Sequence, residues 1–365
     1  MRLAKKQKNT NSKTSSNLSN RSAVGIDIGQ HAIKMVQLSG RSLNQIQLEK
    51  YVITKLPKNI IKGNKIQDYE QLVTYLQHSY AQLHTSAKNF VAALPQSLAT
   101  IETVVYNEKE TDLDLDGFAE FEVSQIAPVE EMNFDYQTVG TSVVPVGQRV
   151  LLTAARKDDV EPRIEAFENA DLPLAAMDID LFAQNNAFSF WINQHAPELE
   201  HEKIAVFGIH ATQMYAAIAQ NGQILYKQET PVSTEQLNQL IQRTYQVTEE
   251  KAAQMMNAAT KPSDYQSAVA DRFNIQVAQE IQRVLQFYYA TQSSEQYSNV
   301  KHILLTGTAS QQPGLAETIF SHTNTATECV HPILYATNSN KIDISQLQID
   351  APTLTLAFGL ALRGL

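Results

Sequence analysis

The chain has 365 residues, of which 43% are apolar and 18% are charged, a balance typical of a globular protein with a full hydrophobic core. Its single cysteine, Cys329, excludes an intramolecular disulfide, and no run of about 18 apolar residues predicts a membrane span. The formal net charge is −9, and the N-terminus lacks the apolar core of a signal peptide. We therefore expect a cytoplasmic protein that does not bind nucleic acid.

The first 21 residues differ in composition from the rest of the chain. They contain six of the basic side chains, no acidic one and few apolar ones. Such a segment cannot bury enough apolar surface to offset the entropy lost on ordering, so we expect residues 1–21 to be a disordered basic tail. The alternative is a tether to an anionic membrane surface, where each basic residue contributes about 1 kcal/mol.

The first half of the ordered chain predicts an α/β layer fold. Ala23–Ile28 is apolar enough for a buried strand, and the residues after Gly29 turn into a second strand. A helix is expected over 68–83, followed by an apolar strand that Pro95 closes. From 95 to about 139 the pattern changes to a strand, an acidic loop and a short helix over 118–126 that Pro128 stops, which indicates an inserted subdomain.

The second half repeats the opening pattern of the first. Residues 203–209 predict a buried strand, and Asn221-Gly222 predicts the turn of a strand hairpin after it. The longest helix is expected over 266–292, where apolar residues recur every three or four positions. We expect a further strand over 302–306 and a helix that Pro313 opens. Two halves that begin alike indicate an internal duplication.

The turn after the first strand is the most informative candidate site. A hairpin turn places backbone N–H groups toward one point, and Gly29 allows close approach of a phosphate. Asp27 is positioned to hold Mg²⁺ through water, and Lys34 to reach a phosphate oxygen. Gln30 and His31 complete the turn. The structural alternative is an ordinary glycine turn with a carboxylate at the strand end.

A second candidate follows the strand that ends at Thr306. Gly307, Thr308 and Ala309 are small residues between a strand and a helix, which leaves room for a nucleobase or a ribose. A tight strand-to-helix turn explains the same residues. No catalytic constellation is visible, because His210 has no serine or cysteine near it in the sequence pattern.

Taken together, the motifs resemble those of the type IV pilus assembly protein PilM family. Val24–Gly29 with Lys34 is similar to the first phosphate motif of actin-like proteins. The order and spacing of further segments are similar to the PilM family from residue 22 to 365, namely in 92–95, 121–128, 134–136, 152–158, 170–173, 178–183, 280–287, 304–307, 313–315 and 357–364.

The resemblance implies an actin-like, duplicated and bilobed α/β fold with an FtsA-like inserted subdomain, 1C. Its implied parts are subdomain 1A over 22–94, 171–202 and 351–365, subdomain 1C over 95–170, subdomain 2A over 203–230 and 300–350, and helical subdomain 2B over 231–299.

The resemblance also implies ligands and partners. Members bind ATP with Mg²⁺ in a central cleft, which would place Asp27 on the metal. The nucleotide contacts implied here are Asp27, Gly29, Gln30, His31, Lys34, His210, Ala211, Thr212, Gly307, Thr308 and Ala309. Members also bind the cytoplasmic N-terminal tail of the inner-membrane protein PilN in a groove between 1A and 1C. The family pattern further implies peripheral attachment to the inner membrane and a link to the pilus motor ATPases. A homo-oligomer is an additional candidate partner state that the sequence leaves open.

The sequence departs from the family at the second phosphate motif. Where an acidic residue, an apolar residue and a glycine are usual, it has Gly208-Ile209-His210, and Thr308 replaces a glycine in the adenosine loop. The carboxylate that would hold Mg²⁺ or orient water is missing. We therefore expect a scaffold that binds PilN, with ATP as a further candidate ligand that it does not hydrolyse. The alternatives are an ATP-hydrolysing actin-like enzyme and a nucleotide-dependent filament.

Overall fold

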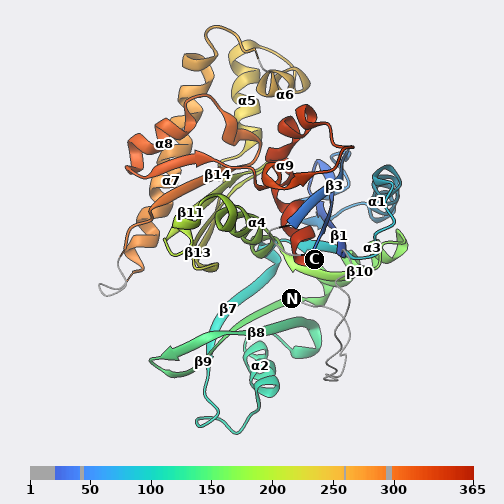
Figure 1. Ribbon diagram of the computed structural model, residues 1–365, viewed down its shortest axis with the longest axis vertical. Helices are drawn as coiled ribbons and strands as arrows, with labels where there is room; N and C mark the ends of the chain where they lie inside the picture. Colours follow the sequence, from blue (N-terminus) through green and yellow to red (C-terminus); the bar gives the residue numbers. More distant parts are fainter. Residues whose placement is uncertain (1–20, 42–44, 259, 293–297) are drawn as a thin grey trace. The chain divides into compact units, whose positions relative to one another are not determined.

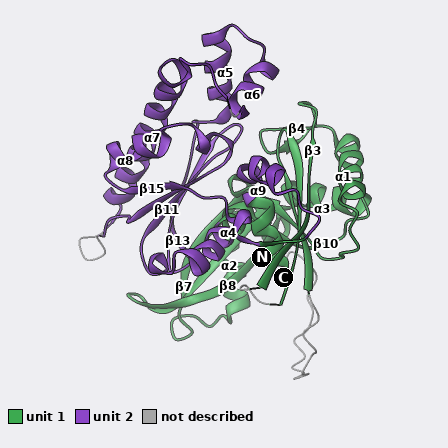
Figure 2. Ribbon diagram, turned by 45° about the horizontal axis from the view of Figure 1, so that its top comes forward, with its two compact units in different colours: residues 1–184, 337–339, 356–365 green, residues 185–336, 340–355 purple. Residues whose placement is uncertain are grey.

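The computed structural model describes residues 21–41, 45–258, 260–292 and 298–365. The chain forms two compact units, which Figure 2 shows in different colours. Unit 1 comprises residues up to Gln184 with 337–339 and 356–365, and unit 2 comprises 185–336 with 340–355. The helices α4 (Asp180–His195) and α9 (Ile344–Gly364) contribute to both units. The predicted tail lies outside the described residues except for Arg21, which is the first residue of a strand.

Unit 1 contains a six-stranded sheet with the order β10-β6-β1-β2-β3-β16. Strands β1, β2 and β3 are antiparallel neighbours, whereas β6 and β10 run parallel to β1. This mixture of a strand meander and parallel strands confirms the predicted α/β class. The bounds are β1 Arg21–Ile28, β2 Ala32–Gly40, β3 Ile46–Lys55, β6 Phe90–Leu94, β10 Leu174–Ile179 and β16 Thr337–Asn338, with a small hairpin of β4 Ile61–Lys62 and β5 Lys65–Ile66.

Helices cover this sheet through apolar side chains and close glycine contacts. Helix α1 (Tyr69–Leu83) packs against β2 and β3 and contacts α3 (Lys157–Asn169). A shared core joins them, including Leu72, Leu76, Phe90 and Phe167. The final turns of α9 approach β1 so closely that a Cβ on Gly25 would lie 2.0 Å from the Ala357 carbonyl oxygen. Only glycine permits this helix-to-strand approach.

The inserted subdomain of unit 1 is a three-stranded antiparallel sheet with the order β7-β9-β8 (Figure 1). Its strands are β7 Ala99–Tyr106, β8 Met132–Val143 and β9 Val146–Arg156. Helix α2 (Leu115–Ser124) lies on this sheet, with Ala119 and Val123 packed on Met132, Leu152 and Ala154. The predicted helix over 118–126 therefore begins earlier, because the Asp114 carboxylate caps it by accepting from the Gly117 N–H at 2.8 Å.

Unit 2 contains a five-stranded sheet with the order β13-β12-β11-β14-β15. Side chains of the sheet and of the helices form a shared core, which includes Phe207, Phe273, Ile281 and Tyr288. The Asn221-Gly222 turn is confirmed: both residues have positive φ and join β12 to β13. The bounds are β11 Ile204–Ile209, β12 Met214–Gln220, β13 Gln223–Thr230, β14 His302–Thr306, β15 Ala326–Cys329, α5 Thr234–Tyr245, α6 Glu249–Asn257, α7 Asp271–Ala290 and α8 Leu315–Thr323.

Of two further predicted helix starts, the one at 266 is confirmed and the one at 313 is wrong by two residues. The long helix begins as a π-helical turn over Gln266–Ala270 before the regular α7. Helix α8 begins at Leu315, not at Pro313, because Gly314 with φ 75° forms its N-cap. The Pro313 carbonyl instead accepts from the Asn274 side chain at 2.7 Å. Across the described ranges, no helix is both long and apolar enough to cross a membrane.

Candidate functional site

The first candidate turn holds a buried ion pair. Asp27 and Lys34 face each other in the β1–β2 hairpin, and the Lys34 ammonium donates to Asp27 Oδ2 at 2.7 Å. Both side chains are largely buried, with exposed fractions of 18% for Lys34 and 10% for Asp27. A carboxylate and an ammonium are therefore fixed beside the turn, and each retains hydrogen-bonding capacity for a ligand.

The turn itself is tight and tied to the next strand. The Gly29 N–H donates to the Ala32 carbonyl at 2.9 Å, and the His31 carbonyl accepts from the Leu56 N–H at 2.8 Å. The nearest atom to a Cβ on Gly29 would be the Ala32 oxygen at 3.4 Å, an ordinary contact. The fold therefore tolerates a side chain at position 29, so the packing of unit 1 does not itself require this glycine.

In unit 2 the corresponding hairpin joins β11 to β12, and an aromatic ring fills the space beside its glycine. Gly208 lies directly opposite Tyr215, and a Cβ on Gly208 would lie 1.8 Å from Tyr215 Cε1. His210 stacks on the same ring, with centroids 5.2 Å apart and planes at 18°. The Tyr215 ring therefore occupies the space that a carboxylate-bearing side chain at position 208 would need.

The turn over 210–213 is fixed to the start of helix α5. The carbonyls of His210 and Ala211 accept from the Thr234 and Glu235 N–H groups at 2.8 and 2.9 Å. N–H groups in the first turn of a helix are the ones that commonly bind phosphates. Here two of these N–H groups donate to carbonyls of the turn. The bonds anchor His210, Ala211 and Thr212, and they occupy those two donors.

The Gly307 loop lies against this turn within unit 2. Gly307 has φ 89°, and a Cβ there would lie 2.3 Å from the Ile209 carbonyl oxygen. Both the backbone angle and the close approach require glycine at this position. The following residues form a short 3-10 turn over Thr308–Gln311, in which Ala309 is buried. Unit 2 thus brings together the two sets of candidate residues that the sequence places about 100 positions apart.

Behind this loop lies a buried polar cluster centred on His331. Its Nδ1 is 3.5 Å from Thr306 Oγ1, and its Nε2 is 3.1 Å from Gln311 Nε2 and 3.4 Å from Cys329 Sγ. Burial lowers the pKa of His331 from its ordinary 6.5 to about 4, so the ring is neutral at pH 7. The cluster therefore supports the loop without adding charge to it.

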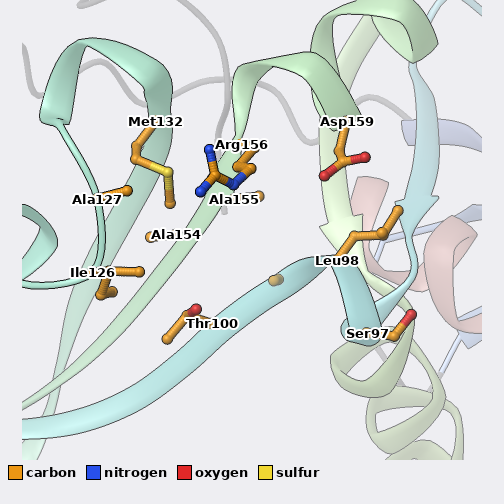
Figure 3. A pocket seen from close by; sticks show the side chains of 11 residues that line it. Ser97, Leu98, Thr100, Ile126, Ala127, Met132, Ala154, Ala155, Arg156 and Asp159 are labelled. Carbon is orange, nitrogen blue, oxygen red and sulfur yellow. The ribbon is translucent and has the colours of Figure 1, made fainter.

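A separate hollow of about 260 Å³ lies in unit 1 where the inserted subdomain leaves the main sheet (Figure 3). Its floor is made of small side chains from paired strands, and Ile126, Met132 and Leu98 form apolar walls. Arg156 and Asp159 supply charge at its rim. We call this hollow the groove; the full lining is Ser97, Leu98, Ala99, Thr100, Ile126, Ala127, Met132, Ala154, Ala155, Arg156 and Asp159.

Hydrogen bonds from three segments hold the groove wall in place. Arg163 on α3 donates to the Asn64 carbonyl and, at 2.6 Å, to the Asp159 carbonyl. The Asn64 side chain in turn donates to Ser97 Oγ at 2.8 Å. Arg156 is paired with Glu131 at 3.3 Å. The wall is therefore held by the β4–β5 turn and by α3, while β7 forms an edge of its sheet.

Sequence reasoning missed Tyr215 and every residue of the groove. The aromatic residue opposite Gly208 follows from the hairpin register, since a turn of four residues pairs position 208 with 215. The groove had no local signal, because its floor consists of alanines and a threonine that also suit an ordinary sheet. Among the described residues, no three His, Cys, Asp or Glu side chains gather to hold a metal ion.

Comparison with known proteins agrees with this geometry. The family model described as type IV pilus assembly protein PilM matches residues 25–365. A solved structure of the "PilM-PilN type IV pilus biogenesis complex" superposes with a TM-score of 0.76 at 21% identity, covering 94% of this chain and 98% of that one. The ethanolamine utilization protein EutJ from Carboxydothermus hydrogenoformans gives 0.56 at 13% identity, with 94% and 90% covered. The fold is thus actin-like, as predicted.

Proposed function

The chain belongs to the type IV pilus assembly protein PilM family, and on this premise we propose that it is a cytoplasmic scaffold of pilus assembly. It would bind the cytoplasmic tail of the inner-membrane protein PilN. This contact would hold it at the membrane surface without insertion into the bilayer. A solved structure that it resembles over 94% of its length is a complex of PilM with PilN.

The groove is the observation that carries this proposal. It is a preformed hollow of about 260 Å³ with apolar walls, large enough for one apolar side chain of a partner. Among the strands that the structure describes, β7, which contributes Ala99 and Thr100, pairs with β9 alone, so its other edge is available to an added strand. An extended tail would gain backbone hydrogen bonds along such an edge and specificity from a side chain in the pocket.

The proposal includes nucleotide binding without hydrolysis. In unit 1, Asp27 and Lys34 fit a Mg²⁺–phosphate group: the ammonium would contact a phosphate and the carboxylate would hold the metal through water. In unit 2, Gly208 provides no carboxylate, and the Tyr215 ring fills the space beside it. Bound ATP would therefore stabilise this scaffold without being hydrolysed, because the described hairpin offers no carboxylate at position 208 to orient an attacking water.

Calorimetric titration with a synthetic PilN tail tests the scaffold assignment. The informative variant is Ile126→Asp, because Ile126 lines the groove and is 37% exposed, so the fold should tolerate the change. The matched control is Ile275→Asp on α7, 44% exposed and remote in sequence from the groove.

We expect binding to the wild type and the control, and a loss of about tenfold or more with Ile126→Asp, since an apolar anchor commonly contributes more than about 1 kcal/mol. Absence of binding to the wild type at high micromolar concentration would refute the scaffold function. Equal binding to both variants would refute its placement in the groove.

A further inference from the structure

The outer side of helix α2 exposes an aromatic side chain to solvent. Phe121 is 51% exposed, and Leu113, just before the helix, is 41% exposed. The opposite side of the helix is buried, with Ala119 and Val123 packed on the sheet. We call Leu113, Glu120 and Phe121 the α2 face. The exposed part of the Phe121 ring adds little to the packing of the helix itself, and it places an apolar side chain where a partner can bury it.

The charge around this face decides what the partner must be. From 95 to 156 the sequence contains eleven acidic and three basic residues, so the inserted subdomain carries a formal net charge of −8. Glu120 is exposed beside Phe121, and exposed carboxylates at Glu110 and Asp112 precede the helix. An apolar anchor surrounded by carboxylates favours a segment that combines apolar side chains with Lys or Arg.

The α2 face also lies next to the groove. Ile126 and Ala127, which line the groove, directly follow the last residues of α2. The helix has 10 residues and is therefore about 15 Å long, a distance that about five extended residues span. A peptide that leaves the groove over α2 would reach Phe121 within those few residues.

Resting on the function proposed above, we propose that the α2 face binds the basic, apolar-containing stretch that follows the groove-bound part of the partner's tail. Cytoplasmic stretches next to membrane spans are enriched in Lys and Arg. The carboxylates of the acidic subdomain attract such a stretch and compete for it with the anionic inner leaflet, which attracts Lys and Arg as well. The groove thus fixes the end of the tail, and the α2 face fixes the stretch nearer the bilayer.

Three peptides separate this inference from the proposed function. The first is the partner's tail alone, the second extends it by the partner's own residues up to its membrane span, and the third replaces the Lys and Arg of that extension with Gln. Each is titrated into the full chain at low and at high salt. The test variant is Glu120→Gln with Phe121→Ala. The matched control is Glu317→Gln with Phe320→Ala on α8, where Phe320 is also 51% exposed.

We expect the extension to tighten binding about tenfold at low salt, and high salt to remove most of this gain because screening weakens charge pairs at the surface. The α2 variant should lose the gain but keep its affinity for the tail alone, and the α8 control should keep both.

Failure of the tail alone to bind would overturn the proposed function and this inference with it. Tail binding without any gain from the extension would overturn this inference only. An equal loss of the gain in both variants, or binding of the chain to anionic vesicles through Phe121, would also overturn it.

Discussion

Replacing Gly208 with alanine tests whether the Tyr215 ring closes the second hairpin. A Cβ at position 208 would lie 1.8 Å from Tyr215 Cε1, far inside the usual carbon–carbon separation of about 3.5–4.0 Å. The ring is buried in a cluster with Trp191 and Phe188, so it cannot move without disturbing this core. Overpacking of this kind costs about 2 kcal/mol, although alanine in a strand otherwise gains about 0.5–1 kcal/mol over glycine.

A double-mutant cycle with Tyr215→Ala isolates the part of this destabilisation that comes from the clash with the ring. Removing the buried ring alone should cost about 3–5 kcal/mol. Once the ring is absent, the added methyl group at position 208 has space, so its cost should vanish. The two changes should therefore be coupled by about 2 kcal/mol, with the double variant more stable than the sum of the single effects predicts.

Equilibrium urea unfolding measures these free energies, and the fluorescence of Trp191 reports them directly. Trp191 is the only tryptophan of the chain and packs in the same cluster as Tyr215. Gly29→Ala in the first hairpin is the matched control, because its Cβ would make only an ordinary contact at 3.4 Å. A neutral Gly208→Ala, or additive effects of the two changes at 208 and 215, would refute the reasoning that the ring blocks the carboxylate position.

Three further predictions concern the loop of unit 2 and the nucleotide. The pKa of His331 is lowered to about 4 in the folded protein, so only the unfolded chain takes up this proton between about pH 6.5 and 4. The free energy of unfolding should therefore fall as the pH drops through this window, by about 2 kcal/mol at pH 5. His331→Gln should abolish this part of the pH dependence when urea unfolding is measured at each pH. Gly307→Ala should lower the melting temperature, because it forces a side chain onto φ 89° and within 2.3 Å of the Ile209 carbonyl; an unchanged value would contradict the described turn. In a single-turnover assay with Mg-ATP, phosphate release should not exceed that of Asp27→Ala, and faster release by the wild type would revive an enzymatic function.

Local turn chemistry made much of the fold predictable. Gly29 and Asn221-Gly222 mark turns whose strands pair as expected, and the apolar repeat of α7 includes Val277 and Ile281, both in the core. These features depend on residues close in sequence. The helix starts at Leu115 and Leu315 were misplaced because single side chains or a glycine, Asp114 and Gly314, override the apolar pattern at the N-cap.

The candidate sites were less predictable because they depend on pairing between distant segments. Asp27 and Lys34 were named from one hairpin, and the structure places them in contact. The closure of Gly208 by Tyr215 needs the register of β12, and the groove needs β7, β8 and β9 to bring Thr100, Met132 and Ala154 together. The ribbon of β8 and β9, with Val143 and Val146 exposed at its tip, has no alternating pattern that would distinguish a buried face.

Site-specific photo-cross-linking to full-length PilN in native membranes tests the central claim most directly. A photoreactive amino acid at Thr100 would stand on the groove floor, and one at Ile275 would stand on an exposed side of α7. We expect a cross-link from position 100 to the cytoplasmic tail of PilN and none from position 275. A cross-link from 275 alone, or none from 100 while the two proteins still co-purify, would show that the groove does not bind the tail.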